Sequence, residues 1–170
     1  CSSDLGIPLN ADVGAINITV TATDISGLFA SDTFTITVAN TNDIPTGVTL
    51  SATAFDENAA GATVGTLTTT DDDNIHGDTH TYALLGTDAD AFEIINDQLK
   101  LLDSLSADYE TQNSYSLIVS TTDDSASTFE QNLIISINDI NEAPTLANAL
   151  ADQNNDEDAA FDLTVPADTF

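Results

Sequence analysis

The sequence predicts an all-β chain organised around a Greek-key β-sandwich of seven strands. Two observations predict this fold class. Apolar and polar residues alternate with a period of two, as where Ile16, Ile18 and Val20 stand between polar residues, and no long segment holds a helical period of about 3.6 residues. The alternating segments are also rich in Thr, Val and Ile, which favour strands over helices.

The middle of the chain holds the complete set of strands. We expect them at residues 47–55, 63–70, 79–85, 91–95, 98–102, 114–122 and 128–138. Clusters of Asp, Asn and Gly lie between these segments, and such residues favour turns. The apolar side chains that we expect to face inward are Leu67, Tyr82, Leu84, Phe92, Leu99, Tyr115, Leu117, Val119, Leu133, Ile135 and Ile137. Seven short strands in about 100 residues are typical of a sandwich.

The chain repeats itself at a spacing of about 99 residues, which indicates tandem domains. Residues 20–45 align with residues 119–144 without a gap, and residues 54–60 are echoed by residues 154–160. We therefore divide the chain into residues 1–45, the C-terminal part of one domain; residues 46–144, a complete domain; and residues 145–170, the N-terminal strands of a third.

The charge balance excludes one large class of partner. The chain has 29 acidic residues and a single basic one, Lys100, for a formal net charge of −28. A chain without cationic side chains cannot neutralise phosphates, so nucleic acid is excluded as a partner. Repulsion between the carboxylates should also destabilise the compact state unless cations bind or screen them.

Motifs of catalysis are absent from the sequence, so we do not expect an enzyme. No nucleophile motif or phosphate-binding loop is present. The single cysteine, Cys1, allows no internal disulfide. His76 and His80 are four residues apart, a spacing that suits zinc on a helix, but they lie in a predicted loop that leads into a strand. We interpret both as exposed loop residues.

The carboxylates concentrate at the ends of the predicted strands. Those that follow the second and sixth strands should lie at one end of the sandwich, the first pole, facing the preceding linker. Those that follow the first strand or precede the sixth should lie at the second pole, facing the next linker. Packed carboxylates repel one another unless cations lie between them. Groups of oxygen ligands suit Ca²⁺, so the sequence predicts Ca²⁺ at both poles.

Five short acidic motifs of the middle repeat stand in a familiar order. They are DEN at 56–58, DDD at 71–73, Asp108-Tyr109-Glu110, TTD at 121–123 and DINEAP at 139–144. In this order they resemble the motifs of a cadherin domain, with Ala107 and Tyr109 as departures from the family's Leu-Asp-Arg-Glu motif. The flanking pieces resemble the dystroglycan-type cadherin-like domains of bacterial repeat-containing surface adhesins. The resemblance implies cadherin-like tandem repeats.

The resemblance also implies Ca²⁺ as cofactor, bound between consecutive domains. At the first junction the implied ligands are Asn40, Asn42, Asp43, Asp71, Asp73 and Asp123. At the second junction they are Glu57, Asp108, Glu110, Asp139, Asn141 and Glu142. Asn40 stands where the family usually has Asp, which removes one negative charge from the first junction.

We therefore expect a calcium-binding structural repeat of a large secreted cell-surface adhesin, with Ca²⁺ at each junction stiffening an extended rod of neighbouring repeats. The alternative is a calcium-dependent homophilic or polysaccharide-binding module. Sugar platforms usually need exposed aromatic rings, and the chain has no Trp. The two partial domains should expose apolar faces and strand edges, which predicts a head-to-tail strand exchange between molecules.

Overall fold

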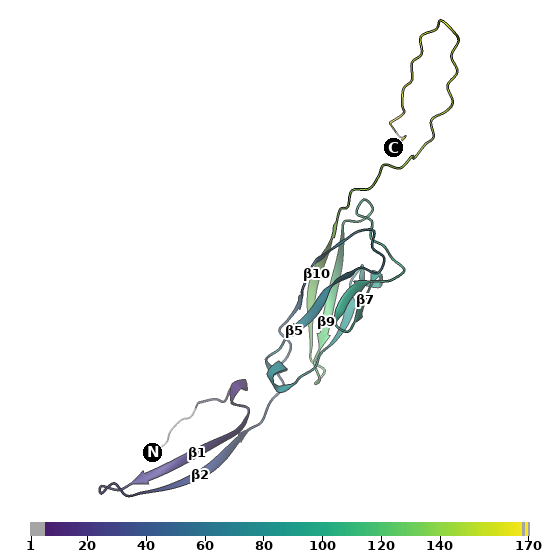
Figure 1. Ribbon diagram of the computed structural model, residues 1–170. Helices are drawn as coiled ribbons and strands as arrows, with labels where there is room; N and C mark the ends of the chain where they lie inside the picture. The colour runs from purple at the N-terminus through teal and green to yellow at the C-terminus, as the bar shows by residue number, and fades with distance from the viewer. Residues whose placement is uncertain (1–5, 168, 170) are drawn as a thin grey trace.

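The computed structural model describes residues 6–167 and residue 169; Cys1 lies outside the described residues. Three parts follow one another end to end (Figure 1). A two-stranded hairpin is followed by a two-sheet sandwich, and the sandwich by a C-terminal segment without strands. In the described part of the chain no helix has the length and apolar character needed to cross a membrane.

The sandwich consists of two four-stranded sheets, which confirms the all-β prediction. One sheet has the order β3-β5-β8-β7 and the other β4-β10-β9-β6. The strands are β3 (Gly47–Leu50), β4 (Ala54–Asp56), β5 (Thr63–Thr70), β6 (Thr81–Leu85), β7 (Phe92–Ile95), β8 (Gln98–Leu101), β9 (Ser114–Thr122) and β10 (Thr128–Asn138). Both sheets present alternating residues to the space between them, and the core lies there.

The first expected strand, residues 47–55, is divided in the structure, so the sandwich has eight strands instead of seven. β3 pairs antiparallel with β5, whereas β4 crosses to the other sheet and pairs parallel with β10. The Ser136 N–H donates to the Thr53 carbonyl over 2.8 Å and fixes the crossing chain. A Cβ on Gly65 would lie 2.8 Å from the Ala52 nitrogen, so the crossing requires glycine at that position.

The predicted core is confirmed. Seven of the expected residues are buried, and the other four pack against them while partly buried: Tyr82, Leu84, Tyr115 and Leu133. Phe92 lies at the centre of an aromatic group, edge-on to Phe55 and to Tyr115. The core also contains five buried residues that were not predicted: Val48, Phe55, Val64, Leu101 and Ala107. This packing holds the strand ends, and with them the poles, in fixed positions.

The N-terminal hairpin comprises β1 (Gly14–Thr23) and β2 (Phe29–Val38), which pair antiparallel over their full length. Asp24 closes the turn, because its carboxylate accepts the N–H groups of Ser26 and Leu28 over 2.8 and 2.9 Å. A short 3₁₀ turn, η1 (Asn10–Asp12), precedes β1. The apolar face of the hairpin stays exposed, with Phe34 at 49% of its full accessibility.

The C-terminal segment, residues 145–167, contains no strand. Its apolar side chains, among them Leu146 and Phe161, are exposed. The repeat aligns this segment with β3, β4 and β5 of the middle domain. In that domain β3 pairs with β5, β5 also pairs with β8, and β4 pairs with β10. Residues 145–170 contain no equivalents of β8 and β10, so the equivalents of β5 and β4 lack these partners. The predicted domain boundaries stay predictions.

Candidate functional site

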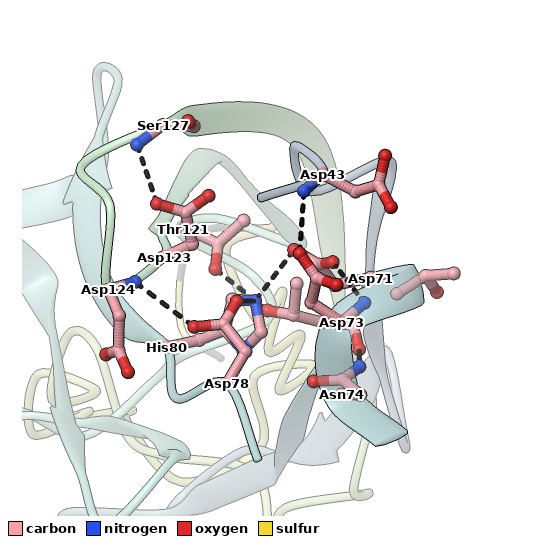
Figure 2. A network of polar contacts seen from close by, with 12 residues as sticks. Asp43, Asp71, Asp73, Asn74, Asp78, His80, Thr121, Asp123, Asp124 and Ser127 are labelled. Atoms are coloured by element: carbon pink, nitrogen blue, oxygen red, sulfur yellow. Dashed lines mark hydrogen bonds and ion pairs between the residues drawn. The ribbon is translucent and has the colours of Figure 1, made fainter. Parts of the chain in front are cut away.

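The first pole of the sandwich gathers three buried carboxylates. Asp71 follows β5, Asp73 lies in the 3₁₀ turn η2 (Asp72–His76), and Asp123 follows β9. The exposed fractions of Asp71, Asp73 and Asp123 are only 6%, 2% and 6%, respectively. Figure 2 shows the carboxylates facing one another and the linker residue Asp43. The predicted convergence of the second and sixth strand ends is therefore present.

The local sequence explains how the first pole forms. Asp71 caps η2, because its Oδ1 accepts the Asp73 N–H over 2.9 Å. Gly77 ends the turn with φ of 92°, a left-handed conformation that favours glycine. Asn74 ties the turn to β5 by donating from its amide to the Thr69 carbonyl over 3.1 Å. These contacts turn the Asp73 side chain inward.

The linker before the sandwich is docked on these carboxylates. The Asp43 N–H donates to Asp73 Oδ2 over 2.6 Å. The Asn42 amide donates to Asp123 Oδ2 over 3.0 Å. The other oxygen of Asp73, Oδ1, is buried and has no hydrogen-bond partner. A buried carboxylate oxygen without a donor is a free ligand position for a cation.

Hydrogen bonding favours the ionised form of Asp123. The Asn42 amide makes the largest contribution and lowers the pKa of Asp123; partial burial acts in the opposite direction. The N–H groups of Ser125 and Ser127 also donate to Asp123 Oδ1, over 2.9 and 2.7 Å, and lower the pKa further. The first pole thus keeps this carboxylate charged by supplying donors.

The side chain of His80 is buried, which corrects the expectation that it is exposed. Its side chain is only 8% exposed, and its Nε2 lies 3.2 Å from Asp71 Oδ2 and 3.6 Å from Asp78 Oδ2. The loop after η2 folds back over the pole before β6 begins, which buries the ring between two carboxylates (Figure 2). His76 is exposed as predicted, and its Nε2 lies 2.9 Å from the Asn10 carbonyl oxygen.

The second pole is built around Glu57, which follows β4 and is 2% exposed. Its Oε2 accepts the Tyr109 N–H and its Oε1 accepts the Ile140 N–H, each over 2.7 Å. Ala107 is 1% exposed and belongs to the core, so the turn is anchored there by a small side chain. Glu57 thereby joins the first half of the sandwich to the outgoing linker.

Four carboxylates converge at the second pole. Glu57, Glu110, Asp139 and Glu142 each offer an oxygen, and these four atoms lie within 4.8 Å of one another. The Asn58 amide donates to Glu142 Oε1 over 2.6 Å and holds it beside the group. A backbone hydrogen bond lowers the pKa of Glu110, but desolvation and the carboxylates of Glu142, Glu57 and Asp139 outweigh it and raise the pKa.

The remaining predicted ligands lie at the margins of the two poles. Asn40 lines a 270 Å³ cavity at the first pole together with Asn42 and Asp73. At the second pole, Asp108 Oδ1 accepts the Thr111 N–H over 3.0 Å and caps its turn. The Asn141 amide donates to the Glu142 carbonyl over 3.3 Å. Asp108 is not one of the four carboxylates that converge at this pole.

One residue of the N-terminal segment, Asn10, reaches the first pole and was missed by the sequence analysis. The Asn10 amide donates to Asp43 Oδ2 over 2.7 Å, and Asp12 lies in the same 3₁₀ turn. Leu9-Asn10-Ala11-Asp12 has the spacing of residues 107–110 of the middle domain. The shift between these two segments is 98 residues instead of 99, so a gapless alignment does not pair them.

Comparison with known proteins identifies the family. The family model of the cadherin domain matches residues 51–138, more than half of the chain. The chain belongs to the cadherin domain family. Cadherin domains are extracellular modules of structural and adhesive function and are not enzymes. No curated protein matches the sequence.

Solved structures of protocadherins share the cadherin fold. The four-domain structure of protocadherin gamma B3 has a TM-score of 0.54 and 21% identity, and the match covers 75% of this chain and 32% of that one. The extracellular domain of protocadherin gamma B4 has a TM-score of 0.52 and 23% identity, covering 76% and 22%. This chain thus spans less than a third of each of these two structures, and the likeness concerns the fold alone.

The donor set of this cadherin domain fits a hard cation. Both poles offer carboxylate and amide oxygens, which are the ligands that Ca²⁺ prefers. Lys100, the single basic residue, pairs with Glu93 and Asp103 on the side of the sandwich and neutralises neither pole. A cation would satisfy the free Asp73 oxygen and would relieve the repulsion from neighbouring carboxylates that, together with desolvation, raises the pKa of Glu110.

Proposed function

We propose that this chain is a calcium-binding structural repeat of a secreted cell-surface adhesin, in which Ca²⁺ at the two junctions stiffens an extended rod. The observation that carries the proposal is the packing of carboxylates at both poles directly against the linkers. Asp73 and Glu57 are each 2% exposed, and each accepts a backbone N–H from a linker, that of Asp43 and of Ile140. A cation bound there would be in contact with the sandwich and with the linker at once.

Each junction has its own set of residues that would hold the ion. At the first junction these are Asn40, Asn42, Asp43, Asp71, Asp73 and Asp123, with Asn10 and Asp12 as additions. At the second they are Glu57, Glu110, Asp139 and Glu142, with Asp108 and Asn141 beside them. The ion supplies positive charge and several coordination bonds, which fix the linker relative to the sandwich.

The acidic residues also make the stiffness of the linkers depend on the concentration of Ca²⁺. Extracellular modules bind Ca²⁺ with dissociation constants of about 10⁻⁴ to 10⁻³ M. At ten times such a constant, one site stabilises the folded state by about 1.4 kcal/mol. Where Ca²⁺ is scarce, repulsion between the carboxylates leaves the linkers loose. In a calcium-rich extracellular medium the same residues make the array stiff.

The proposed setting is a tandem array, with neighbouring repeats as the first partners. The end segments support partial cadherin-like domains of the dystroglycan type, as in bacterial surface adhesins, because residues 20–45 repeat residues 119–144. The exposed apolar face of the hairpin, including Val20 and Phe34, supports a further contact in which residues 145–170 of a second molecule add strands to it.

A polysaccharide partner has weaker support than this self-contact. The exposed Phe side chains in the described part of the chain, Phe29, Phe34 and Phe161, lie on the end segments and not on the sandwich. Sedimentation of the full chain at increasing concentration tests self-contact. Association that Phe34→Ser abolishes supports it, and a monomer at all concentrations contradicts it.

The calcium proposal is tested by thermal unfolding and small-angle scattering of the full chain in EGTA, Mg²⁺ and Ca²⁺. We expect Ca²⁺ to raise the unfolding temperature and the maximum dimension more than Mg²⁺, which demands a tighter octahedron. Asp73→Asn should reduce the effect at the first junction, and the pair Glu110→Gln and Glu142→Gln at the second.

Asp97→Asn is the matched control. Asp97 is an exposed turn residue with φ of 63°, a conformation that Asn tolerates, and it lies outside both groups. It should leave the response to Ca²⁺ unchanged. An unfolding temperature and a maximum dimension that are the same in EGTA and in Ca²⁺ would contradict the proposal.

A further inference from the structure

Asp71, Asp78 and His80 form a second cluster at the first pole, beside the carboxylates that face the linker. One ligand atom from each of the three lies within 4.8 Å of the others. Their side chains are 0%, 6% and 8% exposed. Figure 2 shows the imidazole between the two carboxylates. The cluster is the one place in the described part of the chain where a nitrogen ligand joins such a group of acids.

One oxygen of the cluster has no donor. Asp78 Oδ2 is buried without a hydrogen-bond partner, although it lies 3.6 Å from His80 Nε2. The Asp124 N–H donates to the other oxygen, Asp78 Oδ1, over 3.3 Å and so fixes the carboxylate with Oδ2 toward the ring. A buried, charged oxygen that accepts no hydrogen bond and points at another potential metal ligand is uncommon in folded proteins and needs an explanation.

The two distances from the histidine to the carboxylates match those of a tetrahedral metal site. Zinc binds His nitrogen and carboxylate oxygen at about 2.0–2.2 Å, so neighbouring ligands of a tetrahedron lie about 3.3–3.6 Å apart. The distances from His80 Nε2 to Asp71 Oδ2 and to Asp78 Oδ2 are 3.2 and 3.6 Å. Little movement of the side chains would therefore be required to place an ion among them.

We propose that Asp71, Asp78 and His80 bind Zn²⁺ or a similar first-row transition metal, with water as the fourth ligand. Imidazole suits such metals, whereas Ca²⁺ prefers oxygen ligands alone. Asp71 is common to this cluster and to the proposed calcium set: its Oδ1 accepts the Asp73 N–H and its Oδ2 faces His80, whereas Asp73 accepts the N–H of the linker residue Asp43. The site goes beyond the proposed calcium function and differs from it in the metal and in the histidine.

The test measures metal binding to the full chain directly. Calorimetry with Zn²⁺ in saturating Ca²⁺ gives the affinity, and the visible absorption of Co²⁺ reports its geometry. We expect one Zn²⁺ site and the intense absorption of tetrahedral Co²⁺. Loss of an outer-shell partner costs about 10–100-fold in affinity, so loss of a direct ligand in His80→Gln should cost about 100-fold or more.

His76→Gln is the matched control, because His76 is the chain's other histidine and lies outside the cluster. It should bind Zn²⁺ as the wild type does, and Asp78→Asn should weaken binding as His80→Gln does. His80→Gln should keep its response to Ca²⁺, which separates this site from the calcium function and reports that the variant is folded. Unchanged Zn²⁺ affinity in both His80→Gln and Asp78→Asn, equal losses in His76→Gln, or octahedral Co²⁺ alone would overturn the proposal.

Discussion

The two poles of the sandwich carry similar numbers of acidic residues, but the hydrogen-bond partners of these residues differ. At the first pole the carboxylates accept hydrogen bonds from the linker and from turn backbone, and the pKa of Asp123 is lowered. At the second pole Glu57 has two N–H partners, but three exposed carboxylates stand around it and the pKa of Glu110 is raised. At the first pole, donors compensate the charge of Asp123 and leave one oxygen each of Asp73 and Asp78 without a partner, whereas at the second pole the exposed carboxylates repel one another.

The comparison separates two roles of an acidic residue. An aspartate that accepts backbone N–H groups stabilises the fold with or without a cation, as Asp123 does. A glutamate that faces other carboxylates stabilises the fold only when a cation binds, as expected for Glu110 and Glu142. The metal dependence of the chain should therefore be concentrated at the second pole.

The largest effect should come from Glu57, which has both roles. Glu57→Ala leaves the N–H groups of Tyr109 and Ile140 without acceptors. An unsatisfied donor costs about 1–3 kcal/mol when buried, and these two donors are only partly shielded, so we expect a total loss of about 1–3 kcal/mol in EGTA as well as in Ca²⁺. Urea unfolding measures it. Asp56→Ala, at the exposed neighbouring position, is the control, and a Glu57 variant that is destabilised only in Ca²⁺ would contradict the structural role.

The next largest effect should be a difference between the linkers in hydrogen exchange. Ca²⁺ should slow exchange at Asn141 and Glu142 by about tenfold, a change of about 1.4 kcal/mol in the free energy of opening. Asp43 should change less, because its N–H already donates to Asp73 in the absence of a cation. Exchange detected by mass spectrometry of linker peptides checks this. Equal protection at both linkers would remove the distinction between the poles.

A smaller effect should appear in acid. The folded-state pKa of Asp123 lies below its unfolded value, so Asp123 stabilises the fold above about pH 4 and loses this contribution as the pH falls through the folded-state pKa. Asn42→Ala removes the largest cause and should raise the pKa of Asp123. Carboxyl NMR titration in EGTA measures the shift, with Thr41→Ala in the same linker as control. An Asp123 titration that is the same in both variants would exclude the Asn42 contact as the cause.

The smallest effect should come from the single cation. Lys100 Nζ lies 2.7 Å from Asp103 Oδ1 and 3.2 Å from Glu93 Oε1, in a surface pair far from both clusters. Exposed pairs contribute little and are screened by salt. Lys100→Met should therefore leave the unfolding temperature unchanged at physiological ionic strength. A marked decrease would indicate that net charge, and not its position, limits stability.

The alternating pattern was sufficient to predict most of the sandwich. Residues 114–122 and 128–138 were expected as strands and coincide with β9 and β10, because one face of each alternates into the core. The division of β3 from β4 was not predictable. Residues 51–53 contain no Gly or Pro to mark a break, and the crossing depends on a close approach to Gly65 in another strand.

The site was predictable where the residue type itself has a turn preference. Asp71 and Asp123 follow strands and accept N–H groups two residues on, as Asp does in turns. His80 was not predictable, because its burial depends on how the loop after η2 returns to β6. Asn10 was missed for a different reason, since a change of one residue in the repeat spacing hides it from a gapless alignment.

The parallel pairing of β4 with β10 has a mechanical consequence for a chain loaded along its length. The polypeptide enters the sandwich at the first pole, before β3, and leaves at the second pole, after β10. Tension on the two ends therefore pulls β4 and β10 past each other along their common axis. The hydrogen bonds of this short ladder, in which Ala54–Asp56 lies beside Ser136–Asn138, would be loaded together in shear and not broken one after another. The paired segment of β4 and β10 joins the outgoing strand to Glu57, so this glutamate lies at the point where force leaves the domain.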